Sequence, residues 1–370
     1  LQLSFGSPQP SPGFPVDLDP LFLTPLIDAC KYEEAKNQSI VHLFKKYNVD
    51  AYSGYITVNK TTNSSLFFIF VEAKENPSKA PLMLWTPGGP GLSALFSLLL
   101  QNGPLAFDPS LLLQKGPAAF NDSLLAPRDL TIQKTMNVIY LDAPVGAGFS
   151  FTNSSDGYAK NLDDVTRDII AFLTQFLKVF SQDRDQEFYV AGDSYGARYS
   201  VALAYQLLKY PREDLRLNLQ GVIGGAGFLG PIYEIADSGD FLYQVSMLNE
   251  EGRQIFKQRF ADIKGNASTN PYVALNLLKE AILYAQPTLF QNLTLYDIQA
   301  SPLCTERPSI MMQCFFYVNI SGFFKAAIHA GAKSTLQYPN PSLVGNFIGD
   351  WLVNINDQVE YVLNKTRVLL

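Results

Sequence analysis

The sequence has few of the residues that most often bind metals. Three cysteines and two histidines occur in 370 residues, and they are scattered along the chain. No Cys/His cluster with the spacing of metal ligands is present. We therefore expect neither a metal nor another cofactor.

Charge and long apolar runs are also scarce. Only 17% of the residues are charged, the formal net charge is −6 and the pI is near 5.1. This acidic balance argues against a nucleic-acid partner, which needs a basic surface. The longest largely apolar run, Leu92–Leu100, is nine residues, against about 18 for a membrane span, so we expect no membrane partner. An apolar content of 47% indicates a globular protein.

Sequons for N-glycosylation are abundant. Roughly two to three N-x-[ST] tripeptides would be expected by chance. The sequence has nine, and the excess predicts a secreted or lysosomal glycoprotein, although sequons also arise by chance in Asn-rich loops; the asparagines are Asn37, Asn59, Asn63, Asn121, Asn153, Asn266, Asn292, Asn319 and Asn364.

The cysteines and the N-terminal residue also bear on whether the protein enters the secretory pathway. Cys304 and Cys314 are close enough in sequence for a local disulfide, whereas Cys30 has no evident partner. The chain begins at Leu1 and not at Met, so we expect a processed or cut N-terminus.

The pattern of apolar residues predicts an α/β protein with a mostly parallel central sheet. A β-hairpin is expected first, then buried strands separated by helices, the clearest helix covering 161–180 and another following the strand at 188–191. The expected strands are 55–59, 65–72, 82–85, 136–141, 188–191, 220–226 and 366–370.

Changes in this pattern give the domain boundaries. Residues 1–25 are rich in proline and predict an extended arm. Residues 26–233 predict the α/β core, 234–335 a helical cap or insertion, and 336–370 a return to the core that is incomplete. The oligomeric state stays open.

The segment Gly192-Asp193-Ser194-Tyr195-Gly196 predicts a nucleophile. It matches G-x-S-x-G and lies between an apolar strand and a helix, as that motif requires. A sharp strand-to-helix turn presents the serine hydroxyl above the sheet, and small neighbours avoid clashes there. A glycine-rich turn without catalysis is the plain alternative.

A glycine loop at 88–91 follows the strand at 82–85, about 100 residues before Ser194. Folds with this motif place their second oxyanion-hole donor in such a position. The backbone N–H groups of Gly89 and Tyr195 are the expected donors. An ordinary Pro-Gly turn is the alternative.

With these motifs the chain resembles the serine carboxypeptidases, and most of all their vitellogenic carboxypeptidase-like branch. The resemblance runs from about residue 20 to the last residue. It implies an α/β-hydrolase fold and removal of C-terminal residues from peptide or protein substrates at acidic pH. The segments that carry it are Trp85–Gly91, Leu141–Ser150, Gly192–Gly196, Pro20–Pro25, Tyr55–Lys60 and Ala327–Gly331.

The resemblance also implies a site for the terminal carboxylate of the substrate, formed around Gly88, Gln101 and Asp193. The family uses an amide before the Gly-Gly and acidic groups that share a proton, because a protonated carboxyl can donate to a carboxylate. Here Pro87 replaces the amide, Gln101 replaces one acid, and Asp193 is one methylene shorter than the usual Glu.

The triad partners of Ser194 are not found in this sequence. The family order is Ser, Asp, His, and the single histidine after Ser194 is His329, in a segment that the family uses structurally. Residues 351–364 match the helix before the strand of the catalytic Asp, and 366–370 match the start of that strand. We therefore expect missing C-terminal strands and little activity from this chain.

Three interpretations stay open. The first is a serine carboxypeptidase whose sequence is truncated at its C-terminus. The second is a non-catalytic secreted homologue that binds peptides or has a structural role, which also explains Pro87 and Gln101. The third is an acyltransferase on the same scaffold, suggested by Asp193 alone.

Overall fold

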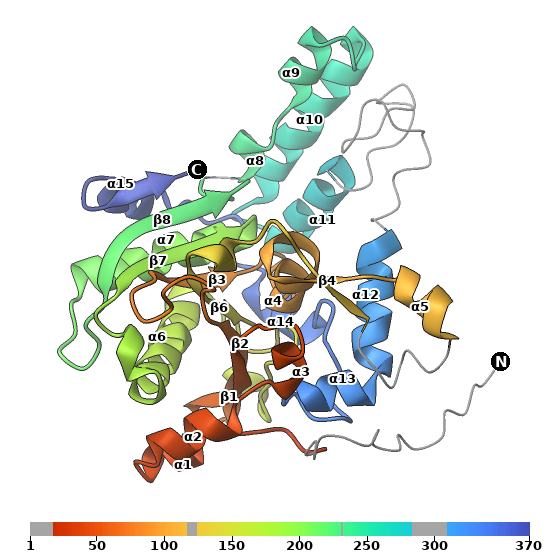
Figure 1. Cartoon of the computed structure of the whole chain (residues 1–370). Helices are drawn as coiled ribbons and strands as arrows, with labels where there is room; N and C mark the ends of the chain where they lie inside the picture. Colours follow the sequence, from red (N-terminus) through yellow and green to blue (C-terminus); the bar gives the residue numbers. More distant parts are fainter. Residues whose placement is uncertain (1–17, 117–123, 231, 283–308) are drawn as a thin grey trace.

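The structure is a computed structural model that describes residues 18–116, 124–230, 232–282 and 309–370 (Figure 1). Within them the main sheet has seven strands in the order β1-β2-β6-β3-β7-β8-β9, and β4 and β5 form a separate pair. The strands are β1 (Ala51–Asn59), β2 (Ser64–Val71), β3 (Leu82–Thr86), β4 (Leu105–Phe107), β5 (Leu125–Pro127), β6 (Asn137–Leu141), β7 (Glu187–Asp193), β8 (Asn218–Gly225) and β9 (Arg367–Leu369).

The sheet is parallel from β6 to β9, and β1 and β2 form the expected antiparallel hairpin at one edge. Neighbouring positions of β2 point to opposite faces: Phe68 and Phe70 enter one core, and Phe67 and Ile69 enter the other. Both faces are buried, which explains why the strand sequences are almost continuously apolar. The α/β class with a mostly parallel sheet is thereby confirmed.

Helices cover both faces of the sheet. α6, α7 and α15 pack on one face with α1 and α2, and α3, α4, α12 and α13 pack on the other. The helices are α1 (Thr24–Asp28), α2 (Tyr32–Gln38), α3 (His42–Lys45), α4 (Ala94–Phe96), α5 (Ser110–Lys115), α6 (Leu162–Val179), α7 (Tyr195–Lys209), α8 (Ile232–Ile235), α9 (Gly239–Gln244), α10 (Glu250–Asn266), α11 (Pro271–Ile282), α12 (Ser309–Ile320), α13 (Gly322–Ala327), α14 (Pro341–Phe347) and α15 (Asn356–Leu363).

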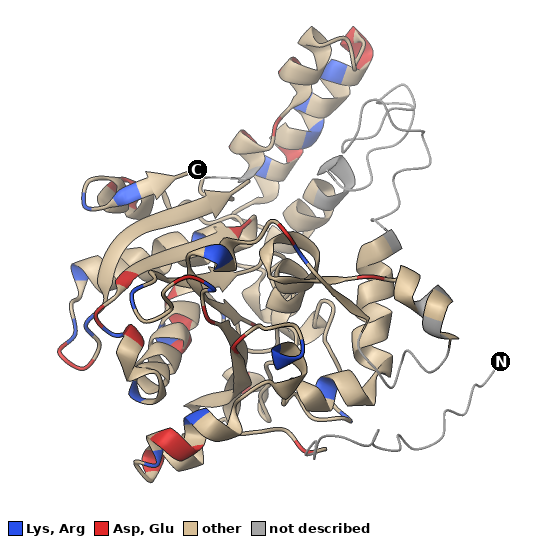
Figure 2. Cartoon of the chain, viewed as in Figure 1, with Lys and Arg blue, Asp and Glu red and all other residues tan. Residues whose placement is uncertain are grey.

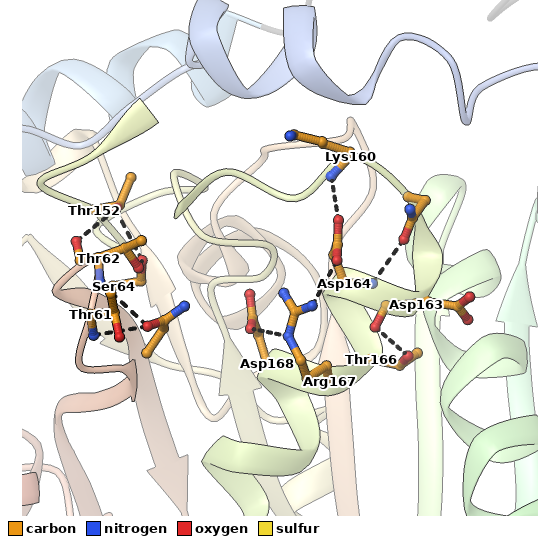
Figure 3. Close-up of polar contacts among 12 residues, drawn as sticks. Thr61, Thr62, Ser64, Thr152, Lys160, Asp163, Asp164, Thr166, Arg167 and Asp168 are labelled. Atoms are coloured by element: carbon orange, nitrogen blue, oxygen red, sulfur yellow. Dashed lines mark hydrogen bonds and ion pairs between the residues drawn. The ribbon is translucent and has the colours of Figure 1, made fainter. Parts of the chain in front are cut away.

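The helix expected at 161–180 is α6, and polar contacts fix where it begins (Figure 3). The Asn161 side chain accepts from the backbone N–H of Asp164 at 2.9 Å, as an N-cap does. Oδ2 of Asp164 accepts from the backbone N–H of Lys160, and its Oδ1 accepts from Arg167. The acidic side chains of this first turn also complement the positive end of the helix dipole.

The helical region after β8 has two parts. Helices α9 to α11 share a small apolar core that includes Phe256, Phe260 and also Leu352 from the segment before α15. α9 and α10 project from the sheet (Figure 1). Acidic and basic residues are interspersed along α10 (Figure 2). Helices α12 and α13 instead pack on the main core through residues such as Tyr317 and Phe324. The single unit at 234–335 stays a prediction.

Two boundaries differ from the expected ones. The helix expected at 351–364 begins only at Asn356, because Trp351 is packed against the Tyr195 ring and the Asn354 side chain accepts from the backbone N–H of Asn356. The extended arm ends before residue 25, since Pro25 lies in the first turn of α1. Residues 1–17 of that arm lie outside the described residues.

Candidate active site

Ser194 lies at the junction of β7 and α7 in a sparsely populated backbone conformation. Its φ is 55° and its ψ is −117°, and its backbone N–H donates to Gly225 O at 2.7 Å. A positive φ costs energy in a residue with a Cβ and persists only where the surroundings impose it. The helix that follows directs its N-terminal dipole at the serine. The strand–turn–helix context expected from the sequence is therefore present.

Gly192 and Gly196 allow β7 and α7 to approach each other and β3 closely. A Cβ on Gly192 would lie 2.8 Å from the backbone oxygen of Thr86, and one on Gly196 would lie 2.8 Å from that of Pro87. Neither position has space for a side chain. The two glycines of the motif are thus required by packing.

The glycine loop lies against the serine, as the sequence predicts. A Cβ on Gly88 would be 2.7 Å from the Cβ of Ser194 and 3.2 Å from its Oγ. Gly89 has φ of 122°, a conformation that other residues rarely adopt. The loop backbone is therefore the wall that faces the Ser194 side chain. It follows β3, which is adjacent to β7 in the sheet, and this explains how segments about 100 residues apart meet.

Asp193 and Gln101 are brought together beside this turn. The Gln101 side chain hydrogen bonds to the Asp193 carboxylate, and partial burial, the larger effect, raises the pKa of Asp193. Gln101 lies on a π-helix, Ser97–Asn102 (η1), that continues α4. π-helical turns are rare in proteins, and those that occur are often found at functional sites. No pattern in the sequence predicts this element.

A buried polar cluster behind the nucleophile turn was not predicted. The Arg198 side chain is fully buried and lies 3.4 Å from Oδ2 of Asp350, which also accepts from the Tyr195 hydroxyl at 2.8 Å. Arg198 further donates to the backbone oxygens of Phe228, Asp350 and Val353. The cluster ties the start of α7 to the segment before α15.

Both histidines of the sequence lie elsewhere. His42 and His329 line a cavity whose wall includes no residue of β7, α7 or the 88–91 loop. His329 follows α13 in a turn with φ of 59° and lies 2.8 Å from the Ser53 hydroxyl.

Among the described residues, no group of three or more His, Cys, Asp or Glu could hold a metal ion, and no helix is long and apolar enough to span a membrane.

The sequon asparagines that are exposed are Asn37, Asn63, Asn153 and Asn364. Asn59, Asn266 and Asn319 are partly buried, and Asn121 and Asn292 lie outside the described residues, as does Cys304, so the Cys304–Cys314 pair stays a prediction.

A mostly parallel sheet with helices on both faces, and a serine at a strand-to-helix turn, is the arrangement of an α/β-hydrolase. The serine carboxypeptidase family model matches residues 43–320, and the chain belongs to the serine carboxypeptidase family. Family and fold together support a carboxypeptidase function.

Named relatives agree with this assignment. The chain is 33% identical over 360 residues to the probable serine carboxypeptidase CPVL of Homo sapiens, covering 95% of this chain and 72% of that one. It is 33% identical over 359 residues to the vitellogenic carboxypeptidase of Aedes aegypti, with the same coverage. It is 35% identical to the venom serine carboxypeptidase of Apis mellifera over 78% of this chain and 60% of that one.

A solved structure has the same fold. Kex1(Δ)p, a prohormone-processing carboxypeptidase from Saccharomyces cerevisiae, superposes with a TM-score of 0.70 at 16% identity, covering 86% of this chain and 72% of that one. The α/β-hydrolase fold expected from the sequence is thereby confirmed.

Proposed function

We propose that Ser194 is the nucleophile of a carboxypeptidase that acts on the last peptide bond of its substrates. In this reaction Ser194 Oγ attacks the carbonyl carbon of the last peptide bond while a general base takes the hydroxyl proton. The C–N bond then breaks, and the C-terminal amino acid leaves with that proton. Water then cleaves the acyl-enzyme. The strained turn at Ser194, with Gly88 packed against its side chain, is the observation that carries the proposal.

The oxyanion of the tetrahedral intermediate would bind to the backbone N–H groups of Gly89 and Tyr195. Tyr195 is the first residue of α7, so its N–H has no partner within the helix. Gly89 belongs to the loop that contacts Ser194. Donors fixed by the backbone are suited to this role because they need no reorganisation during the reaction.

The terminal carboxylate of the substrate would be held by Gly88, Gln101 and Asp193. Partial burial raises the pKa of Asp193, which favours its protonated form as the pH falls. A protonated Asp193 donates a hydrogen bond to the substrate carboxylate, whereas an ionised one repels it. We therefore propose that acidic pH favours substrate binding.

The test is release of the C-terminal amino acid from an N-blocked dipeptide at pH 4–6. Ser194→Ala should abolish the release that the parent protein shows. Ser200→Ala is the matched control, because Ser200 lies on the same helix and its hydroxyl donates to the backbone oxygen of Gly196. Turnover that survives Ser194→Ala would contradict the proposal.

A peptide-binding protein without turnover is the second candidate. It is favoured by the location of both histidines in a different cavity and by Pro87, which offers no side-chain hydrogen bond. In that case the parent chain binds the blocked dipeptide without cleaving it, and Ser194→Ala binds it equally well. Isothermal calorimetry and the release assay separate the two candidates.

We propose that the protein passes through the secretory pathway and is a secreted or lysosomal glycoprotein. The exposed sequons support it, since Asn37, Asn63, Asn153 and Asn364 are accessible to a glycosyltransferase on the folded surface. Glycosidase-sensitive mass of the protein expressed in a eukaryotic cell tests this location. A protein of unmodified mass would overturn it.

A further inference from the structure

The π-helix η1 brings Gln101 to the Ser194 site, and groups outside η1 hold it in place. Together α4 and η1 run from just after the glycine loop to Asn102. A π-helical turn has i→i+5 hydrogen bonds, where an α-helix has i→i+4, so the turn contains one more residue. The side chains that follow it consequently point in a different direction. The direction of the Gln101 side chain therefore depends on how η1 is maintained.

The start of this element is fixed by Asp142, which directly follows β6. Oδ1 of its buried carboxyl group accepts from the Ser93 hydroxyl at 2.8 Å and from the backbone N–H of Ala94 at 2.7 Å. Oδ2 accepts from the backbone N–H of Phe149 at 2.8 Å. Three hydrogen bonds to one buried group thus determine where α4 begins.

The end of η1 is held by Arg128, which directly follows β5. Its Nη2 donates to Leu99 O at 2.9 Å, and its Nη1 donates to Gly103 O at 3.3 Å. The last carbonyl groups of a helix have no partner within the helix. The planar fork of an arginine can satisfy two of them at once. Arg128 therefore completes the hydrogen bonding at the point where η1 ends.

A second contact at this end comes from Tyr140 on β6, which is buried. Its hydroxyl donates to Oδ1 of Asn102 at 2.7 Å and accepts from Nε2 of Gln133 at 2.8 Å. Asn102 directly follows Gln101 in the sequence. Gln101 thus lies between backbone and side-chain groups that Arg128 and Tyr140 hold from outside the helix.

The geometry leaves one hydrogen of the Gln101 amide for a substrate. Gln101 is exposed, and its side chain hydrogen bonds to the Asp193 carboxylate. A carboxylate only accepts, so Gln101 donates with one of its two amide hydrogens. The second hydrogen can be donated to the terminal carboxylate of a peptide. A hydrogen bond to a charged group is about twice as strong as one to a neutral group, so a peptide amide gains less from this contact.

We propose that Arg128 and Tyr140 are positioning residues, which hold η1 so that Gln101 selects ligands with a free C-terminal carboxylate. Both residues act through η1, Arg128 on its backbone and Tyr140 on the Asn102 side chain. The inference rests on the carboxylate site of the proposed function, and it does not depend on the role of Ser194 as nucleophile.

The test compares binding of an N-blocked dipeptide with binding of its C-terminal amide, by isothermal calorimetry at pH 5, where the acid is ionised. All proteins carry Ser194→Ala, so the result does not depend on turnover. We expect this background to bind the acid about tenfold more tightly than the amide. Arg128→Met and Tyr140→Phe should each remove most of this preference and change the affinity for the amide little.

A double-mutant cycle separates positioning from general support of the fold. Gln101→Ala should also remove the preference, and adding Arg128→Met to Gln101→Ala should cause no further loss. Arg184→Met is the control, because Arg184 likewise donates to a helix carbonyl, Leu177 O of α6, and it should keep the preference. Amide hydrogen exchange at residues 97–103 should be faster in Arg128→Met and unchanged in Arg184→Met.

The outcomes distinguish failure of this inference from failure of the carboxylate site. If Arg128→Met or Tyr140→Phe keeps the preference that Gln101→Ala loses, the inference is wrong and the carboxylate site stands. Equal losses from Arg128→Met with and without Gln101, or unchanged hydrogen exchange at 97–103, would also overturn it. A Ser194→Ala protein that binds acid and amide equally would refute the carboxylate site, and with it the role of both residues.

Discussion

The Tyr195 hydroxyl donates a hydrogen bond of 2.8 Å to Oδ2 of Asp350, 155 positions further along the chain. The same carboxylate lies 3.4 Å from the buried Arg198 guanidinium, and its other oxygen accepts from the backbone N–H of Leu162. One acidic side chain thereby connects the start of α7 with the start of α6. The nucleophile turn is held from behind by this carboxylate.

The first prediction concerns this carboxylate. Asp350→Asn leaves the Arg198 charge buried without a counter-ion, and we expect it to lower the free energy of unfolding by about 3–5 kcal/mol. Urea denaturation followed by circular dichroism measures the change. Asp214→Asn is the control, because it removes an exposed partner of Arg212 and should alter stability little. Equal effects of the two variants would contradict this role of Asp350.

Gly88→Ala tests the contact between the glycine loop and the serine. The added methyl group would lie 2.7 Å from the Ser194 Cβ, so the loop must move, at a cost of about 1–3 kcal/mol, and activity should be lost. Thermal unfolding and the blocked-dipeptide assay measure the two effects. Gly345→Ala is the control, since a Cβ there meets nothing within 4 Å and alanine favours helix α14. A Gly88→Ala protein with parental stability would show that the loop does not contact Ser194.

Stability should decrease as the pH rises from about 4 to 7, owing to Asp183. Burial, with the nearby Glu72 charge as a further cause, raises the pKa of Asp183 to about 7, against about 3.9 in an unfolded chain. Between these values the folded state keeps a proton that the unfolded state releases. The free energy of unfolding therefore falls by up to about 4 kcal/mol as the pH rises, and changes no further above 7.

Asp183→Asn should remove the part of that dependence that is due to Asp183, because Asn resembles the protonated carboxyl and can still accept from the Asn137 side chain. The variant should match the parent at pH 4 and exceed its stability at pH 8. Urea titrations at the two pH values measure this. The exposed neighbour Asp185→Asn should retain the parental profile. A parent whose stability does not vary between pH 4 and 8 would refute the assignment.

Glycan occupancy should follow side-chain access. The Asn319 amide donates to the backbone oxygens of Phe315 and Leu336, and its oxygen accepts from the backbone N–H of Leu336, so a glycan there would break the link between α12 and the segment at 336. We expect Asn319 to be unmodified and Asn63 and Asn153, which are exposed, to be modified. Glycopeptide mass spectrometry of protein from eukaryotic cells tests this. A glycan on Asn319 would show that this hydrogen bonding does not protect it.

Local patterns predicted most of the central sheet and α6. β3 and β6 are short and almost wholly apolar, and α6 has apolar residues at spacings of three and four, so their burial follows from the sequence alone. The position of Ser194 also followed, because the glycines of the motif restrict the turn.

Features that depend on distant contacts were missed. The π-helix that carries Gln101 has no distinct sequence pattern, since its residues would equally form an α-helix. The helix at the end of the chain begins five residues later than expected, at Asn356, because Trp351 is engaged with Tyr195. The sequence alone did not indicate that Asp350 is buried, because a charged residue is expected at the surface unless its partner is known.

The Arg198–Asp350 contact has a consequence for synthesis of the protein. The two residues are 152 positions apart. Ribosomes add about 5–20 residues per second, so Arg198 is made roughly 8–30 s before its counter-ion. During that interval the guanidinium cannot be buried with Asp350, and the start of α7 stays accessible to water. The nucleophile turn is therefore completed only after Asp350, which follows it in the sequence, has been synthesised.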